Sequence, residues 1–238
     1  MPVQNYDNTI GTFHMLEAMS DWTCVLDDNS RLPFQFADDA DEYLTLRRGT
    51  LWNDTGNRTM LLYRAYLAGY RWALVMDCDM LPSRALFDWL LGVDLGGYSH
   101  ADADLYLPIR DLWNSGNCYR TDGPWANKKY PLLQTNPFFY LDYHVRPRLR
   151  RLHAPISKNK VIRPRCPSGC CLYHFGSITP ELRIARVEKY RKEDGKNEFQ
   201  SDYEYLADET GVTLADMPEE DAAFIKNWIV RRRLPINQ

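Results

Sequence analysis

The chain alternates short apolar runs with longer stretches of helical spacing. A short continuous apolar run is typical of a strand covered on both faces, whereas apolar residues recurring with the period of a helix are typical of a helix with one buried face. The predicted strands cover residues 22–26, 73–76 and 104–109. The predicted helices cover residues 5–20, 58–70, 81–91, 179–194, 202–209 and 218–230.

Strand, helix and strand follow one another through the first half of the chain, which is the order of a doubly wound α/β fold. Turn and cap residues agree with the helix limits. Gly69 ends one helix, Pro82 lies in the first turn of the next, and Thr179 caps a third. We therefore predict an α/β fold with a parallel sheet and further helices towards the C-terminus.

Two carboxylates, Asp77 and Asp79, directly follow the apolar run at 73–76. In an extended chain, residues i and i+2 point to the same side, so both carboxylates can face the crevice at the carboxyl end of the strand, where open α/β sheets bind ligands. Neighbouring carboxylates repel each other unless a cation joins them, and a hard divalent cation prefers oxygen ligands. The pair therefore predicts a Mg²⁺ or Mn²⁺ site, with two solvated acids in a loop as the alternative.

Composition restricts the class of protein only loosely. Of the 238 residues, 26% are charged and 45% are hydrophobic, which is ordinary for a soluble globular protein. The sequence shows no apolar run long enough for a membrane span and no leader pattern at its start, so we expect a cytoplasmic protein. The six cysteines lack the pattern of a disulfide framework and predict reduced thiols.

Several segments resemble family 2 type glycosyltransferases with the GT-A fold. Those similar to the nucleotide-sugar half are residues 5–8 (Asn-Tyr-Asp-Asn), 25–30 (Val-Leu-Asp-Asp-Asn-Ser) and 72–79 (Trp-Ala-Leu-Val-Met-Asp-Cys-Asp). Those similar to uncharacterised members with a His-Phe-Gly motif are residues 119–125 (Tyr-Arg-Thr-Asp-Gly-Pro-Trp) and 173–183 (Tyr-His-Phe-Gly-Ser-Ile-Thr-Pro-Glu-Leu-Arg). In one departure, the family's first strand is normally longer and apolar, whereas almost nothing precedes Val3 here.

The resemblance implies a GT-A fold, with a Rossmann-like, mostly parallel sheet flanked by helices. Residues 1–178 would form the nucleotide-sugar-binding and catalytic domain, and residues 179–238 a helical C-terminal extension packed on it. The implied activity is metal-dependent transfer of a sugar from a nucleotide diphosphate donor, such as a UDP- or GDP-sugar, to an acceptor that the sequence does not identify.

The resemblance also implies roles for individual residues. Asp28 would bind the base or ribose of the nucleotide, and Asp77 the ribose and metal-bound water. Asp79 would bind Mn²⁺ or Mg²⁺ directly, and His174 would complete the metal shell. Arg58, at the start of a helix, would reach the pyrophosphate. The alternatives are a turn cap for Asp28, a core histidine for His174 and a solvated arginine for Arg58.

An inverting transferase also needs a base for the acceptor hydroxyl, and the candidate is Asp122. Trp113 and Trp125 flank it and, together with Arg120, are candidate substrate-binding residues because aromatic faces stack on sugar rings. The alternatives are an Asp-Gly-Pro turn for Asp122 and core positions for the two tryptophans. A retaining enzyme would need no such base, and the sequence does not choose between the two outcomes.

A basic stretch from Arg146 to Arg165 supports a second hypothesis. Its cations, with no intervening acid, are Arg146, Arg148, Arg150, Arg151, Lys158, Lys160, Arg163 and Arg165. The stretch could be a solvated loop, a loop that grips the diphosphate, or a track for nucleic acid or another polyanion. Two further alternatives are less well supported: a nucleotidyltransferase lacks its glycine-rich loop here, and a zinc site at Cys166, Cys170, Cys171 and His174 would have irregular spacing.

Overall fold

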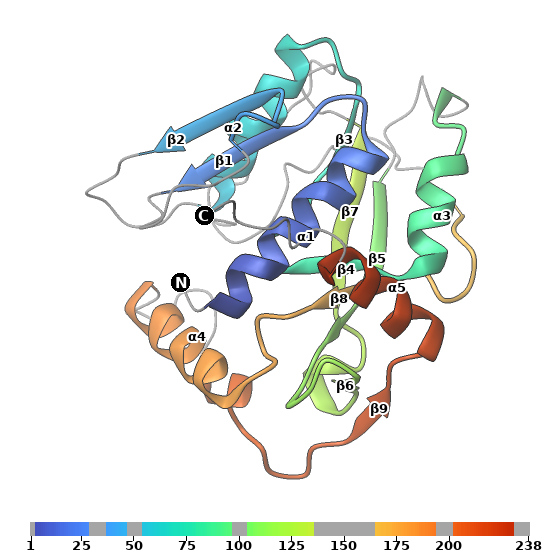
Figure 1. Ribbon diagram of the computed structural model, residues 1–238. Coiled ribbons are helices and arrows are strands. Elements are labelled where there is room, and N and C mark those ends of the chain that lie inside the picture. Colours follow the sequence, from blue (N-terminus) through green and yellow to red (C-terminus); the bar gives the residue numbers. More distant parts are fainter. Residues whose placement is uncertain are drawn as a thin grey trace, which may run out of the picture.

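The computed structural model describes residues 3–28, 37–46, 54–96, 104–135, 165–193 and 202–230. Within these residues the fold is mixed α/β, and its largest sheet has five strands (Figure 1). Their order across this sheet is β3 (Trp72–Leu74), β7 (Lys129–Thr135), β5 (Asp104–Asp111), β8 (Leu172–His174) and β4 (Met80–Pro82). Two small sheets pair β1 (Cys24–Asp28) with β2 (Glu42–Leu46) and β6 (Cys118–Arg120) with β9 (Leu214–Asp216).

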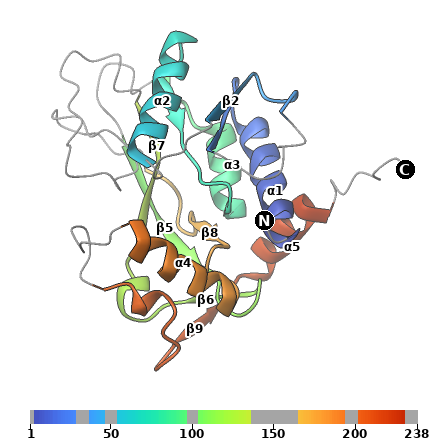
Figure 2. The same cartoon turned by 90° about the vertical axis from the view of Figure 1, so that its left-hand side faces the viewer.

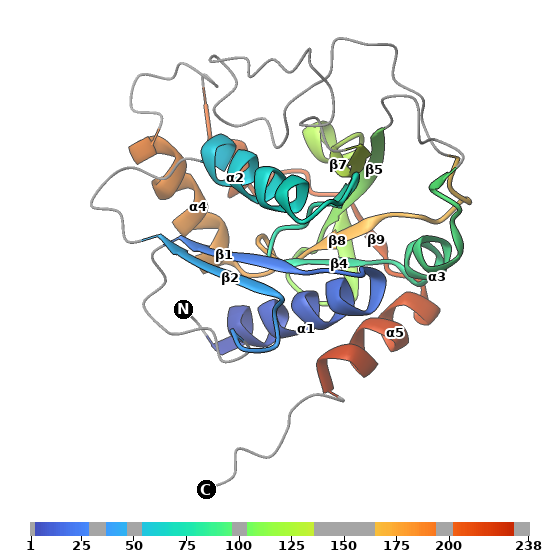
Figure 3. The same cartoon turned by 90° about the horizontal axis from the view of Figure 1, so that it is seen from above.

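The helices cover both sides of this framework. Helices α1 (Val3–Met19), α3 (Arg84–Gly92) and α5 (Glu219–Val230) group beside β4, and the β1/β2 pair lies between α1 and α2 (Asp54–Leu67) (Figure 3). Helix α4 (Pro180–Glu193) lies with the β6/β9 pair at the lower end of the molecule (Figures 1 and 2). A 3₁₀ turn at Glu204–Leu206 packs on α4, and another, at Gly123–Trp125, precedes β7.

One buried cluster joins the two ends of the described chain. It contains Met15 of α1, Leu81 of β4 and Phe87 of α3, together with Phe224 and Ile225 of α5. Burial of each such side chain contributes about 1.5–3 kcal/mol. The C-terminal helix therefore shares a hydrophobic core with the N-terminal helix and the sheet.

A polar contact fixes the start of α5 against the same strands. The Asp221 carboxylate is 7% exposed and accepts hydrogen bonds from the Arg84 backbone N–H at 2.8 Å and from the Tyr173 hydroxyl at 2.6 Å. Tyr173 is the middle residue of β8, so this strand is anchored directly to the first turn of α5.

Most predicted helices are confirmed, and their ends follow ordinary capping chemistry. Helices α1, α2, α4 and α5 correspond to the predicted stretches 5–20, 58–70, 179–194 and 218–230. The Thr179 hydroxyl accepts a hydrogen bond from the Leu182 N–H at 3.3 Å and caps α4, as predicted. The strands predicted at 22–26 and 104–109 correspond to β1 and β5.

The predicted helix at 81–91 begins too early. Ser83 is the N-cap, and its hydroxyl accepts a hydrogen bond from the Leu86 N–H, so α3 starts at Arg84. Pro82 instead ends β4, the last strand in the described sheet order, where a missing N–H is tolerated. The predicted helix at 202–209 is also wrong, since only the turn Glu204–Leu206 forms there, with Leu206 buried.

The expectation of a mostly parallel sheet is wrong for the five-stranded sheet as far as it is described. Only β5 and β8 are parallel neighbours, whereas β3/β7, β5/β7 and β4/β8 are antiparallel. The β1/β2 pair is parallel. Strand β3 is also not central: it lies at one end of the sheet order, and its residues are half-buried. The apolar run was correctly identified as a strand, but β7, with which it pairs, gave no clear sequence signal.

The described residues include all six cysteines, and each is a free thiol, as the sequence predicts. In the described part of the chain, none of the helices combines the length and apolar character that crossing a membrane requires.

Candidate functional site

The site is built around a tight turn that carries both acids of the Asp-x-Asp motif. Strand β3 ends at Leu74, and the Met80 N–H donates to the Asp77 carbonyl at 3.1 Å, which closes the turn. The Thr12 hydroxyl of α1, 2% exposed, lies 2.7 Å from the Met80 carbonyl and 3.1 Å from the Cys78 carbonyl. Helix α1 therefore holds the turn from one side.

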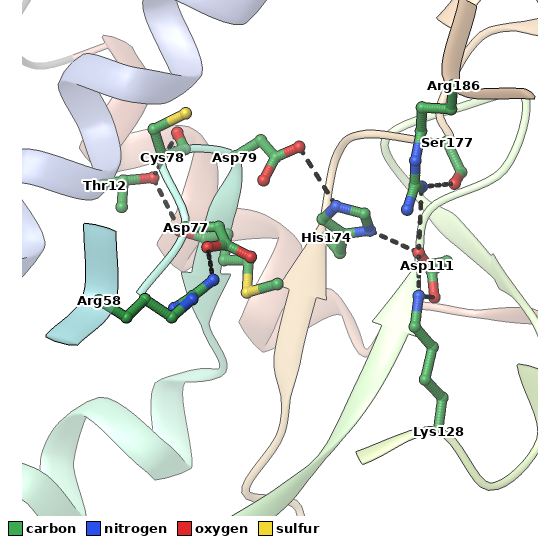
Figure 4. Close-up of polar contacts among 11 residues, drawn as sticks. Thr12, Arg58, Asp77, Cys78, Asp79, Asp111, Lys128, His174, Ser177 and Arg186 are labelled. Carbon is green, nitrogen blue, oxygen red and sulfur yellow. Dashed lines mark hydrogen bonds and ion pairs between the residues drawn. The ribbon is translucent and has the colours of Figure 1, made fainter. Parts of the chain in front are cut away.

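The two carboxylates of this turn contact different partners (Figure 4). Asp77 pairs with Arg58 of α2, and Asp79 pairs with His174 of β8. The sequence predicted an extended segment with both carboxylates on one side, and this is wrong because the chain reverses between them. Only Asp79 contacts His174, so the acids of the motif have separate environments.

Arg58 lies beside the turn that carries Asp77 and Asp79, and its predicted contact with a pyrophosphate stays a prediction. Its side chain is 6% exposed, and one guanidinium nitrogen donates to the Tyr130 hydroxyl at 2.7 Å while the other contacts Asp77. Held between Tyr130 and Asp77, the guanidinium has a fixed position next to the turn.

His174 lies between two carboxylates. Its Nε2 is 3.2 Å from Asp79 Oδ2, and its Nδ1 is 2.5 Å from Asp111 Oδ1 (Figure 4). Asp111 ends β5 directly opposite His174 of the parallel strand β8, so backbone register brings the two side chains together. Sequence reasoning missed Asp111, although it follows a predicted strand just as Asp77 does.

Asp111 is the most deeply buried acid of this group. Its side chain is 1% exposed, and Lys128 Nζ contacts both of its oxygens, at 2.9 and 3.1 Å. Arg186 of α4 lies 3.9 Å from Asp111 and donates to the Ser177 hydroxyl at 2.6 Å. Two cations and His174 therefore surround one buried carboxylate, which meets the requirement that buried charges be paired.

These contacts shift the ionisation of all three central groups. Burial alone would raise the pKa of Asp79, but His174 and, more weakly, Arg186 lower it to about 2. Burial opposes a charged imidazole, but Asp79 and Asp111 outweigh it and raise the pKa of His174 to about 9. Lys128 and His174 likewise overcome the effect of burial on Asp111 and hold its pKa far below the ordinary range. Without a metal, the geometry therefore places a proton on Nε2, facing Asp79.

The distance between Asp79 and His174 is compatible with a divalent cation bound by both side chains. Ligands at right angles and about 2.1 Å from an ion are about 3 Å apart, close to the 3.2 Å between Asp79 Oδ2 and His174 Nε2. Among the described residues, no group of three or more His, Cys, Asp and Glu side chains could hold a metal. Two protein ligands nevertheless suit Mg²⁺ or Mn²⁺ bound together with water and substrate phosphates.

Gly176 places no side chain beside this pair. A Cβ at this position would lie 2.7 Å from Asp79 Oδ2 and 2.8 Å from His174 Nε2. Any side chain would therefore occupy the position between the two ligands. The glycine of the His-Phe-Gly motif keeps the contact between Asp79 and His174 open to a bound group.

The predicted acceptor-side residues lie in a different cluster. Asp122 accepts three hydrogen bonds from Arg120, at 2.8–3.0 Å, and one from the Thr213 N–H at 2.9 Å. Trp113 and Trp125 are 0% and 4% exposed and pack edge to face, with the Arg120 guanidinium over Trp113. The core alternative for the two tryptophans matches this placement, and neither ring presents a free face to solvent.

Some predicted site residues lie outside what the structure describes. The basic stretch is described only at Arg165, and the side chain of Asp28 is not described, so both predictions stay untested. The zinc alternative has no support among the described residues, because Cys170 and Cys171 belong to different core clusters.

Comparison with known proteins does not assign the chain to a class. No known family model matches it, and no curated protein matches it significantly. The resemblance to glycosyltransferases therefore rests on the sequence motifs alone.

Proposed function

We propose that this protein is a metal-dependent glycosyltransferase that moves a sugar from a nucleoside diphosphate donor to an acceptor. The supporting observation is the contact between Asp79 of the Asp-x-Asp turn and His174 of the His-Phe-Gly motif. These residues are 95 positions apart and come from two of the five segments that carry the resemblance. Their separation and the absence of a side chain at Gly176 suit a hard divalent cation.

The charge of the site also suits a diphosphate. The pair formed by Asp77 and Arg58 is neutral, and the carboxylates of Asp79 and Asp111 are balanced by Lys128 and Arg186. Among these described residues, a divalent cation bound to neutral His174 would therefore leave two positive charges unbalanced. A nucleoside diphosphate supplies about that much negative charge, whereas a neutral ligand would not.

In such a reaction, different described residues would bind the cation, add positive charge and hold the turn in place. Asp79 and His174 would hold the cation, and a bound cation supplies positive charge at the departing diphosphate. Lys128 and Arg186, whose side chains are 33% and 20% exposed, add positive charge on the far side of His174. Thr12 keeps the turn, and therefore Asp79, in place.

We assign no proton transfer to Asp122 in this proposal. Hydrogen bonds from Arg120 lower the pKa of Asp122 to about 2, although partial burial acts to raise it. A carboxylate with so low a pKa is a weak base near neutral pH. Whether the reaction inverts or retains configuration stays open.

A GT-A-type fold is part of the proposal. The order of the motifs along the chain supports it, and so does the position of the acids directly after β3. The mainly antiparallel pairing of the described five-stranded sheet does not support it.

The proposal is tested by incubating the protein with Mn²⁺ and a panel of nucleotide sugars without acceptor, and measuring hydrolysis. We expect slow release of nucleoside diphosphate from at least one donor, and loss of that release in Asp79→Asn. Asp88→Asn is the matched control, because it removes an exposed acid that pairs only along α3 with Arg84. Absence of both turnover and nucleotide binding in the wild type would refute the proposal. Salt-sensitive binding of nucleic acid without turnover would instead favour the polyanion-binding hypothesis.

A further inference from the structure

The carboxylate of Asp111 contacts the imidazole ring of His174, and the opposite side of that ring contacts Asp79. Backbone pairing between β5 and β8 places Asp111 opposite His174, and the next residue, Leu112, donates its N–H to the His174 carbonyl at 3.0 Å. The side-chain contact between Asp111 Oδ1 and His174 Nδ1 is 2.5 Å. Both the backbone and the side chain of His174 are therefore fixed by the end of β5.

Lys128 in turn fixes the carboxylate of Asp111. Its ammonium bridges both carboxylate oxygens, and its position is supported by the ring of Trp125, 5.1 Å away. Because the Asp111 side chain is 1% exposed, water does not compete for its oxygens. Besides its contact with Lys128, Oδ1 of this carboxylate accepts the hydrogen bond of the His174 imidazole.

We propose that Asp111 is a positioning residue that holds the proton of His174 on Nδ1 and so presents the Nε2 lone pair to a divalent cation shared with Asp79. This inference rests on the proposed metal-dependent function and adds to it a residue that neither the sequence motifs nor the resemblance indicate. A histidine that binds a metal through one nitrogen commonly donates its other N–H to a carboxylate, which orients the ring and strengthens the ligand. Asp111 occupies that position relative to Asp79 and His174.

The test compares Asp111→Leu, which removes the acceptor, with Asp111→Asn, which keeps a neutral one. Mn²⁺ affinity is measured by electron paramagnetic resonance, and coupling of Mn²⁺ to an imidazole nitrogen by its pulsed form. With Cd²⁺ as a diamagnetic stand-in, ¹⁵N resonances show which ring nitrogen carries the proton. We expect Asp111→Leu to lower Mn²⁺ affinity about 10- to 100-fold and to weaken the nitrogen coupling. Asp111→Asn should lose less affinity, and its Nδ1 proton resonance should move upfield.

Asp221→Asn is the matched control. Asp221 is also a buried acid in contact with β8, but it binds Tyr173, whose side chain faces away from that of His174 in the strand. We expect this variant to melt at a lower temperature and to keep wild-type Mn²⁺ affinity and nitrogen coupling. The same result would show that a general loss of packing around β8 does not imitate the loss of Asp111.

The outcomes separate the inference from the function on which it rests. Wild-type protein that binds no Mn²⁺, or binds it without nitrogen coupling, overturns the proposed ligand set and the inference together. If the wild-type protein shows nitrogen coupling and turnover, and both Asp111→Asn and Asp111→Leu keep its Mn²⁺ affinity, the positioning role alone is overturned. If Asp111→Leu does not fold, Asp111→Asn decides, because an unchanged affinity and an unchanged Nδ1 proton resonance contradict the inference.

Discussion

The absence of a side chain at Gly176, beside Asp79 and His174, gives the sharpest single-residue prediction. Gly176→Ala adds one Cβ, which would lie 2.7 Å from Asp79 Oδ2, 2.8 Å from His174 Nε2 and 2.9 Å from His174 Cε1. The backbone at Gly176 is outside the left-handed region, so alanine brings no backbone strain. His174 is held by Asp111, whereas the Asp79 side chain is 30% exposed and free to turn outward. We therefore expect the Asp79 side chain to turn outward and the backbone at position 176 to move away from His174, whose ring stays in place.

The size of the effect follows from this geometry. Ordinary contact with a Cβ begins at 3.4 Å, so Asp79 Oδ2 must move by about 0.7 Å, which breaks its alignment with His174. Overpacking of this kind costs about 1–3 kcal/mol, and the exposed position of Asp79 favours the lower half of that range. For a chain of this size, a loss of about 1–2 kcal/mol lowers Tm by about 2–8 °C. Tenfold weaker binding of the metal and nucleotide removes about 1.4 kcal/mol of ligand stabilisation.

The assay is thermal unfolding with and without Mn²⁺ and a nucleoside diphosphate. At a ligand concentration about 100 times Kd, wild-type protein gains about 2.7 kcal/mol, and Gly176→Ala should gain half of this or less. Gly116→Ala is the matched control, because no atom lies within 4 Å of its added Cβ and its backbone is likewise outside the left-handed region. The reasoning is refuted if Gly176→Ala binds Mn²⁺ and nucleotide as tightly as Gly116→Ala.

Two further predictions concern the turn and the acceptor-side cluster. Thr12→Val removes the hydroxyl that is bonded to the carbonyls of Met80 and Cys78. We expect the free energy of unfolding, measured in urea, to fall by about 1–3 kcal/mol and nucleotide binding to weaken. An unchanged unfolding midpoint would contradict this. Bonds from Arg120 lower the folded-state pKa of Asp122 to about 2, below its unfolded value of about 3.9, so its contribution to stability is present above about pH 4 and is lost as the pH falls towards 2. Asp122→Asn should therefore flatten the stability curve over that interval by about 1–2 kcal/mol after solvent screening, and parallel curves for the two proteins would rule this out.

The helices could be predicted from sequence because their signals are local. Thr179 and Pro180 mark the start of α4, and the acids at the start of α5 favour its N-terminus. The strands β4 and β8 have three residues each, too few to show a period. They form because β8 pairs with both β5 and β4, which are distant in sequence. The antiparallel character of the sheet therefore could not be read from the chain.

The same distinction applies to the site. The resemblance to GT-A glycosyltransferases predicted that Asp79 and His174 share a site, and the structure brings their side chains into contact. The turn at Asp77 depends on a hydroxyl of α1, more than 60 residues away, and the pairing of Asp111 depends on strand register. Neither contact leaves a local signal, although the position of Asp111 after a predicted strand marks the residue itself as a candidate.

Strand β8 connects the candidate site with the C-terminal helix through two consecutive side chains. His174 points towards Asp79, and Tyr173 is bonded to Asp221 of α5. A shortened protein that lacks α5 would lose this bond and also Phe224 and Ile225 from the cluster that contains Tyr173, which is far more than the Asp221→Asn variant removes. Attempts to define a minimal fragment that keeps the candidate site should retain residues through at least Val230, and deletion of the last described helix should be treated as an alteration of the site itself.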